Sequence, residues 1–319
     1  MSLYFDFLSL NVGIETGKVK AKEQQEFVEK NNFRTKEEAK RYFYLEKIHD
    51  VKPAIVCLQE QIPKDVKEIN GKMIEDLSAK LKAKYTPFYE SYGSNKQAAV
   101  LVKKDFISDN SKLKRVEFTN ADTREYSEIR ARLVLVEFTP NGFSLPIYIG
   151  SWHGPWTGPW GGEKLERQRK YVDAILKRVK THVGERPFFI AGDFNLKHRD
   201  LPQLPHYCYS ISAKNDKIDY LIVGRNGTSS YPENLNKVTF KDPKMTVIAE
   251  VRESGYKRSD AESFLGHTPQ LANVTITEKQ SSSDVASLRT GFSSFFSTQN
   301  IVISIAASLF VFLILKKNR

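Results

Sequence analysis

Alternating and continuous runs of apolar residues predict a series of β-strands along most of the chain. Four of these strands lead into polar residues, and they cover 3–11, 53–60, 145–153 and 187–195. A further strand, 217–223, carries an acidic residue near its start. The other predicted strands cover 98–104, 128–138, 246–253 and 267–277. Apolar and polar residues alternate clearly in 128–138, and this predicts a sheet with one covered face.

Helical patterns lie between the predicted strands. Residues 35–50 open with Thr35 and carry Glu38 three positions later, which is the spacing of an N-terminal capping box. Residues 65–85 and 163–182 repeat apolar side chains every three or four positions, so we expect amphipathic helices there. We find no internal repeat.

The composition changes after about residue 278. Residues 279–300 are Ser-rich and form a predicted linker, 301–315 are apolar and uncharged, and 316–319 form a basic tail. The apolar run would span roughly 22 Å as a helix, against a hydrocarbon core of ~30 Å. We interpret it as a C-terminal membrane anchor, and the alternative is a buried terminal helix. With the main domain, 1–278, in the cytosol, the anchor would suit the endoplasmic reticulum or the mitochondrial outer membrane.

The composition is that of a folded protein with a polyanionic partner. The chain has 319 residues, of which 40% are apolar, and a formal net charge of +11. That charge favours nucleic acid, an anionic membrane face or a phosphorylated substrate. The two cysteines, Cys57 and Cys208, form no CxxC pair, and Cys57 lies in an apolar run typical of a core residue.

Polar residues of a restricted set stand at the ends or starts of the predicted strands. Carboxylates and carboxamides are ligands for a hard divalent cation, and imidazoles donate protons or offset negative charge at a phosphate. The set consists of Asn11, Glu60, His153, Asp193, Asn195, Asp219 and His267.

The motifs around these residues, taken in order, resemble one protein family. They are LSLNV, CLQE, GSWHGP, GDFN, KIDYLIV and GHTPQLANV. Together they resemble the endonuclease/exonuclease/phosphatase superfamily, which includes DNase I-like nucleases, abasic-site endonucleases, inositol polyphosphate 5-phosphatases and neutral sphingomyelinases. The resemblance covers about residues 3–277. It implies an α/β four-layer sandwich of two packed mixed β-sheets flanked by helices, with the active site at one end.

The resemblance also implies roles for single residues. Asn11 and Glu60 match the positions that hold the catalytic metal, expected to be Mg²⁺ or Mn²⁺. His153 matches the histidine that contacts the scissile phosphate. Asp193 and Asn195 match the pair that orients the attacking water and the phosphate.

Three further assignments concern the last histidine and the substrate. Asp219 matches the acid that orients the last histidine, His267. Arg130, in a stretch like the family's Glu-x-Arg strand start, is the expected phosphate contact, with Arg124 and Arg132 as alternatives. Apart from the resemblance, Trp152, Trp156 and Trp160 in a Gly/Pro/Trp loop would stack on a base or a lipid headgroup, or would simply pack the loop, and Trp156 is the expected substrate contact.

One position departs from the family pattern. The family ends its motif with Ser-Asp-His, and here Gly266 stands where that Asp is expected. Losing one acidic group should weaken metal binding without removing the rest of the site.

These observations predict a Mg²⁺-dependent phosphodiester hydrolase, most simply a membrane-tethered nuclease that cleaves DNA or RNA. One alternative is a phospholipid-directed enzyme, sphingomyelinase-like or acting on inositol phosphates. The other is a phosphate-binding membrane protein with impaired catalysis.

Overall fold

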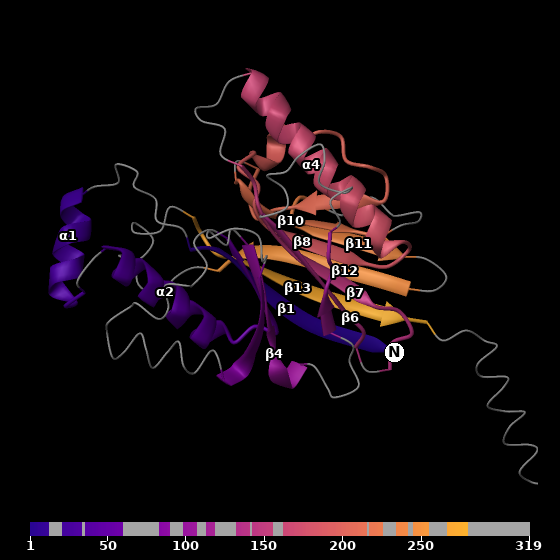
Figure 1. The fold of residues 1–319 in the computed structure, drawn as a ribbon, viewed down its shortest axis with the longest axis horizontal. Helices are drawn as coiled ribbons and strands as arrows, with labels where there is room; N and C mark the ends of the chain where they lie inside the picture. The colour runs from indigo at the N-terminus through magenta and orange to yellow at the C-terminus, as the bar shows by residue number, and fades with distance from the viewer. Residues whose placement is uncertain are drawn as a thin grey trace, which may run out of the picture.

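The fold consists of two β-sheets packed face to face with helices on their outer faces (Figure 1). The computed structural model describes residues 1–12, 21–33, 36–59, 83–89, 98–106, 113–118, 132–140, 142–155, 162–215, 217–225, 234–241, 245–254 and 267–279. One sheet has seven strands in the order β11-β12-β13-β1-β2-β4-β3, and the other has six in the order β5-β6-β7-β8-β10-β9.

The strands of the seven-stranded sheet are β1 (Ser2–Asn11), β2 (Ile55–Gln59), β3 (Tyr85–Tyr89), β4 (Ala98–Lys103), β11 (Lys237–Lys241), β12 (Met245–Glu253) and β13 (Gln270–Glu278). Those of the six-stranded sheet are β5 (Leu113–Arg115), β6 (Leu133–Phe138), β7 (Ile147–His153), β8 (Phe188–Asp193), β9 (Cys208–Ile211) and β10 (Asp219–Gly224). The helices are α1 (Ala21–Lys30), α2 (Lys36–Val51) and α4 (Gly162–Val183), with short 3₁₀ turns η2 (Lys104–Phe106) and η5 (His198–Asp200).

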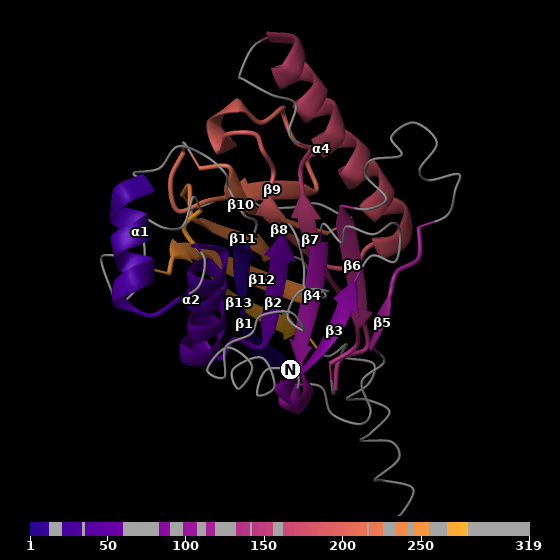
Figure 2. The ribbon, with the colours of Figure 1, turned by 60° about the vertical axis from the view of Figure 1, so that its left-hand side comes forward.

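Each sheet has one parallel pair of strands near its middle. These pairs are β1 with β2 and β7 with β8, and every other pairing is antiparallel. A parallel pair needs a long crossover connection. The crossovers carry α1 and α2 on one side and α4 on the other, so helices flank both sheets (Figure 2).

Three apolar clusters hold these layers together. The largest lies between the sheets and contains Phe5, Phe7 and Phe189, with Phe5 edge-on to Phe189 at 5.8 Å between ring centroids. A second cluster joins the six-stranded sheet to α4, and a third joins the seven-stranded sheet to α1 and α2. Successive residues of β8 pack on opposite faces of its sheet: Phe189 packs against the other sheet, and Phe188 packs against α4. The predicted four-layer sandwich is therefore confirmed.

Most of the predicted strands are confirmed within a few residues of their expected bounds. The interpretation of 128–138 was wrong where the structure describes it, because β6 is covered on both faces rather than one. Leu133 and Leu135 pack toward α4, while Val134 and Val136 pack into the core between the sheets.

The predicted helices meet different outcomes. The 35–50 and 163–182 patterns form α2 and α4. Most of the predicted helix 65–85 lies in 60–82, outside the described residues, and its last residue, Tyr85, instead begins β3. The elements α1, β3, β5, β9 and β11 were not predicted, because their sequences are short or mostly polar.

The membrane anchor expected from the sequence is contradicted, and with it the expected endoplasmic-reticulum or mitochondrial localisation. No helix in the described ranges is long and apolar enough to cross a membrane. The run 301–315, on which that expectation rested, lies outside the described residues, as do 280–300 and 316–319. Its length gives a physical reason for the correction, since a helix of that run spans roughly 22 Å against ~30 Å of hydrocarbon.

Candidate functional site

Strand pairing brings the sequence-predicted polar residues to one end of the sandwich. His153 is the last residue of β7 and lies in register with Asp193, the last residue of β8. Asp193 is in turn in register with Asp219, the first residue of the antiparallel strand β10. Asn11 ends β1 of the other sheet and reaches Asp193 across the gap between the sheets. Residues far apart in sequence thus converge because strands from both sheets end together.

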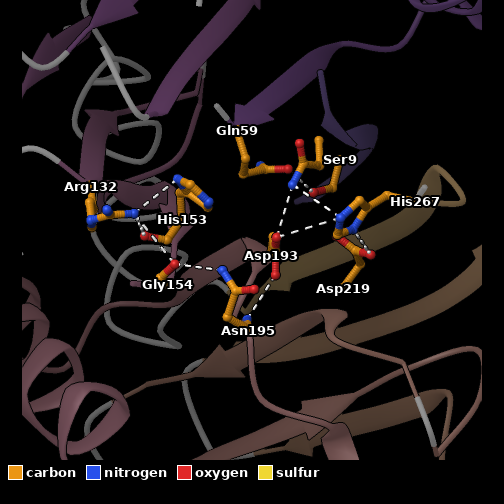
Figure 3. Close-up of polar contacts among 10 residues, drawn as sticks. Ser9, Gln59, Arg132, His153, Gly154, Asp193, Asn195, Asp219 and His267 are labelled. Carbon is orange, nitrogen blue, oxygen red and sulfur yellow. Dashed lines mark hydrogen bonds and ion pairs between the residues drawn. The ribbon is translucent and has the colours of Figure 1, made fainter. Parts of the chain in front are cut away.

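Asp193 is the hub of this site (Figure 3). The side chain is 1% exposed, its Oδ2 accepts a 2.9 Å hydrogen bond from Asn11 Nδ2, and its Oδ1 accepts a 2.7 Å bond from the Asn195 backbone N–H. Burial raises the pKa of Asp193 to about 6, and the charge of Asp219 acts in the same direction. The pKa is held down in part by His267 and His153. A cation bound nearby would keep this carboxylate ionised.

His267 and Asp219 form a tight buried pair. His267 Nδ1 lies 2.7 Å from Asp219 Oδ2, so Nδ1 carries a proton and donates it to the carboxylate. The other ring nitrogen, Nε2, lies 3.8 Å from Asp193 Oδ2 and 3.4 Å from Asn11 Nδ2. The contact with Asp219 fixes one ring nitrogen, and the other ring nitrogen, Nε2, lies toward Asp193 and Asn11.

Asn195 ties the segment after β8 to the segment after β7. Its backbone is left-handed, with φ of 50°, a conformation that Asn tolerates better than most residues. Its Nδ2 donates to the Gly154 carbonyl at 2.6 Å, and the Gly154 N–H donates to the Asp193 carbonyl at 2.6 Å. A Cβ on Gly154 would lie 2.3 Å from the Phe194 carbonyl oxygen, so the close approach requires glycine.

His153 is held by an arginine. Arg132 Nη1 lies 3.1 Å from His153 Nδ1 and 3.4 Å from each of the carbonyl oxygens of His153 and Gly154 (Figure 3). Because a guanidinium only donates, Nδ1 accepts, and the proton of a neutral His153 is on Nε2. Arg130, the favoured phosphate contact, and Arg124 lie outside the described residues, and it is Arg132 that the structure places beside His153.

A buried polar network behind the site was missed by the sequence reasoning. Gln59 Nε2 donates to Ser151 Oγ at 3.0 Å, Ser151 Oγ donates to the Leu58 carbonyl at 2.8 Å, and Ser9 Oγ donates to Gln59 Oε1 at 3.4 Å. Gln59 is fully buried and joins the two sheets next to Asn11, its register partner. The one signal for it in the sequence is a Gln in the strand IVCLQ, where a buried amide needs partners.

Several predicted positions lie outside the described residues. They are Glu60, Arg130, Trp156 and Gly266.

The described donor set fits a hard divalent cation. Asp193, Asp219 and His267 are all buried and place one ligand atom each within 4.8 Å of one another. Two carboxylates that face each other in a dry site carry excess negative charge, which a cation would offset. Asn11 is the described member of the metal pair that the resemblance implied, and its carboxamide adjoins this cluster.

The cysteines play no part in this site. Both are buried, and burial raises the pKa of the Cys208 thiol to about 12 and that of Cys57 further still. Neither thiol forms the nucleophilic thiolate at neutral pH. The prediction that Cys57 is a core residue is confirmed.

Comparisons with solved structures agree with the fold. Humanized D. rerio TDP2 is 15% identical with a TM-score of 0.51, and the match covers 86% of this chain and 99% of that one. An endonuclease/exonuclease/phosphatase family protein from Bacteroides thetaiotaomicron is 10% identical with a TM-score of 0.50, covering 86% of this chain and 98% of the other. No protein-family model and no curated protein matches the sequence.

The chain therefore has the fold of the endonuclease/exonuclease/phosphatase family. The resemblance inferred from the ordered motifs is confirmed at the level of the fold. Of the described candidate residues, Asn11, His153, Asp193 and Asp219 stand at strand ends, and His267 lies three residues before β13.

Proposed function

We propose that this protein is a divalent-metal-dependent hydrolase of phosphate esters, and that its substrate is a phosphodiester of DNA or RNA. The observation that carries the proposal is the buried linkage Asp219–His267 with Asn11 and Asp193 beside it, built from strands of both sheets. Burying these ionisable side chains costs free energy of folding, and an ordinary turn at the end of a strand does not require it. Clusters of this kind are typical of functional sites.

Asp193 would take the proton of the attacking water. Both of its oxygens are fixed by donors, from Asn11 and from the Asn195 backbone, so the carboxylate is held in one orientation. Asn195 is anchored through Gly154 and would help to position the water and the phosphate. A base fixed within hydrogen-bond reach of its water is what general-base catalysis requires.

The two histidines would stabilise negative charge on the phosphate. His153 presents Nε2–H because Arg132 occupies its Nδ1, and His267 presents Nε2 because Asp219 occupies its Nδ1. Donors that are oriented before the reaction stabilise a developing charge without reorganising.

Asn11 and Glu60 are the proposed metal ligands, with the cluster around Asp193 adjoining them. When bound, Mg²⁺ or Mn²⁺ would neutralise charge on the phosphate oxygens and lower the pKa of a bound water. The proposal of a nucleic-acid substrate is supported by the net charge of +11.

The experiment uses the full chain and four substitutions. His153→Ala and Asp193→Asn remove proposed catalytic groups, while His206→Ala and Asp50→Asn make the same chemical changes at exposed positions. Each protein is incubated with plasmid DNA, single-stranded RNA or sphingomyelin vesicles, in Mg²⁺, Mn²⁺ or EDTA.

We expect cleavage of DNA or RNA that needs metal, that disappears in His153→Ala and Asp193→Asn, and that persists in both controls. Turnover of sphingomyelin alone would favour the phospholipid-directed alternative over a nuclease. Binding of nucleic acid without turnover by the unsubstituted chain would contradict the hydrolase and favour the impaired phosphate-binding protein.

A further inference from the structure

A basic cavity lies at the other end of the sandwich from the candidate site. It has a volume of about 330 Å³ and is formed where α2 ends, where β3 begins and where β4 passes into η2. Four lysines line it, together with one acidic side chain, Asp105. The lysines are Lys52, Lys84, Lys103 and Lys104.

This cavity is separate from the candidate active site. Lys52 lies just before β2, and Gln59, at the other end of β2, belongs to the network behind the site. Strand β4 spans the separation, because its first residue, Ala98, pairs with Gln59 and its last, Lys103, lines the cavity; the two stand five positions apart, or roughly 17 Å at ~3.4 Å per residue. A ligand in the cavity therefore does not reach Asp193.

The charge in the cavity is unbalanced. Lys103 pairs with Asp105 at 3.0 Å, and Asp105 is the one carboxylate in the lining. Within the described ranges, the ammonium groups of Lys52 and Lys84 form no hydrogen bond or ion pair. Like charges gathered in one concavity repel one another and attract an anion. The end of α2 would by itself favour a nearby cation such as Lys52. It does not explain the other three lysines, Lys84, Lys103 and Lys104, because they belong to other segments of the chain.

Lys52 is also held in an unusual backbone conformation. Its φ is 51°, and its N–H donates to the Ile48 carbonyl at 2.9 Å, which is the left-handed ending of a helix. Glycine or Asn normally occupies that position, and the other described non-glycine residues with positive φ are Asn32 and Asn195. A lysine there costs stability that glycine would not, and such strain often marks a functional position.

We propose that this cavity binds a phosphorylated small molecule of about mononucleotide size. The ammonium groups would hold the phosphate, and the apolar lining from Ile48 and Ala83 would contact the rest of the ligand. The volume exceeds that of a phosphate ion and matches the lower range of small-ligand pockets. This site goes beyond the proposed hydrolase and does not depend on it.

The test is calorimetric titration of the full chain in EDTA with AMP, inorganic phosphate and adenosine. AMP should bind, adenosine should not, and phosphate should bind more weakly than AMP. In Lys84→Gln/Lys104→Gln the affinity for AMP should fall at least ~10-fold through loss of charge-assisted contacts. Lys30→Gln/Lys241→Gln, which removes the same charge at exposed positions, should bind AMP normally.

Two further variants separate this site from the hydrolase. His267→Ala should keep AMP binding, and Lys84→Gln/Lys104→Gln should keep any phosphoesterase activity. Lys52→Gly should raise the midpoint of thermal unfolding by about 2 °C, because it removes the backbone strain. The same substitution should lower the affinity for AMP, because it removes one of the ammonium groups that would bind the phosphate. Equal AMP affinity in both double variants would overturn the proposal, as would lysine-dependent binding of oligonucleotides without binding of AMP.

Discussion

The ring of Phe194 lies flat on the ring of Tyr220, with centroids 4.1 Å apart and planes 9° from parallel. Each ring follows an acid of the site, since Phe194 comes after Asp193 and Tyr220 after Asp219, and the two acids are register partners. The stack therefore holds the ends of β8 and β10 together beneath the polar cluster. Both rings are almost fully buried.

Phe194→Ala should destabilise the protein and displace Asp193. Removing a buried aromatic side chain costs about 3–5 kcal/mol of unfolding free energy. Urea unfolding should show that loss of stability, and kcat of Phe194→Ala should fall under conditions where the protein is still folded. Phe194→Leu should lose less stability and less kcat than Phe194→Ala. Equal kcat in the unsubstituted protein and the two variants would contradict a role of Phe194 in positioning Asp193.

Tyr220→Phe separates the ring from its hydroxyl. Within the described part of the chain, the buried Tyr220 hydroxyl has no hydrogen-bond partner. Because a buried unpaired hydroxyl costs free energy, its removal should leave activity intact and raise stability by about 1 kcal/mol. A large loss of stability on urea unfolding would show that the hydroxyl has an essential partner.

Asp219→Asn tests the orientation of His267. The carboxamide of Asn would face His267 Nδ1 either with its NH₂, which cannot accept a hydrogen bond, or with an uncharged oxygen. The ring would therefore lose the contact that fixes its tautomer and the negative charge beside it. By analogy with other acid–histidine pairs, we expect kcat to fall by about 10²–10⁴-fold with little change in KM. Asp50→Asn is the matched control, and unchanged kcat in Asp219→Asn would show that the contact of Asp219 with His267 does not contribute to catalysis.

Arg132→Lys tests the contact to His153. A lysine keeps the charge, but its ammonium lies one bond nearer to the backbone than Nη1, the atom that contacts His153 Nδ1 and the two carbonyl oxygens. We expect kcat/KM to fall by about 10–100-fold while circular dichroism shows a folded protein. Arg252→Lys, at an exposed position of β12, should have no effect, and equal losses in both variants would show that bulk charge is responsible.

Glu253 predicts a pH dependence of stability. Partial burial by itself would raise its pKa, but hydrogen bonds and charge from Lys217 and Lys214 lower it below the ordinary value. Their Nζ atoms lie 2.9 Å and 3.1 Å from the carboxylate. A lowered pKa contributes stability above the unfolded-state value of about 4.3, and this is lost as pH falls through the folded-state pKa.

Glu253→Gln should therefore reduce unfolding free energy at pH 7 and flatten its decline between about pH 5 and pH 3. The loss should stay below ~1 kcal/mol because these ion pairs are partly exposed. Glu250→Gln, at an exposed position of the same strand, is the control. Urea unfolding at several pH values provides the measurement, and parallel curves for the two variants would contradict the prediction.

The chemistry of the candidate site could be predicted because it depends on residue type and local pattern. An apolar run that ends in Asp193 and Asn195 already places polar groups at a strand end, and period-two and period-3.6 patterns already indicate strands and helices. The order of the motifs was enough to indicate the fold. The short strands β5 and β9 were missed because three or four residues have no clear period.

The contacts could not be predicted in the same way. That β6 is covered on both faces follows from α4 packing on one side and a second sheet on the other. That Arg132 contacts His153 follows from the pairing of β6 with β7, which one sequence does not specify. The basic cavity likewise joins elements whose local sequences indicate only solvated lysines.

By itself, the sequence determined which side chains are available, where strands and helices form, and which ends of them are polar. Only the tertiary structure decided that Asn11 meets Asp193, that Asp219 holds His267, and that no described helix can cross a membrane. The reason is physical: backbone propensity and burial pattern act over a few residues. Proximity depends on strand order and register, which are set by the packing of the whole sandwich.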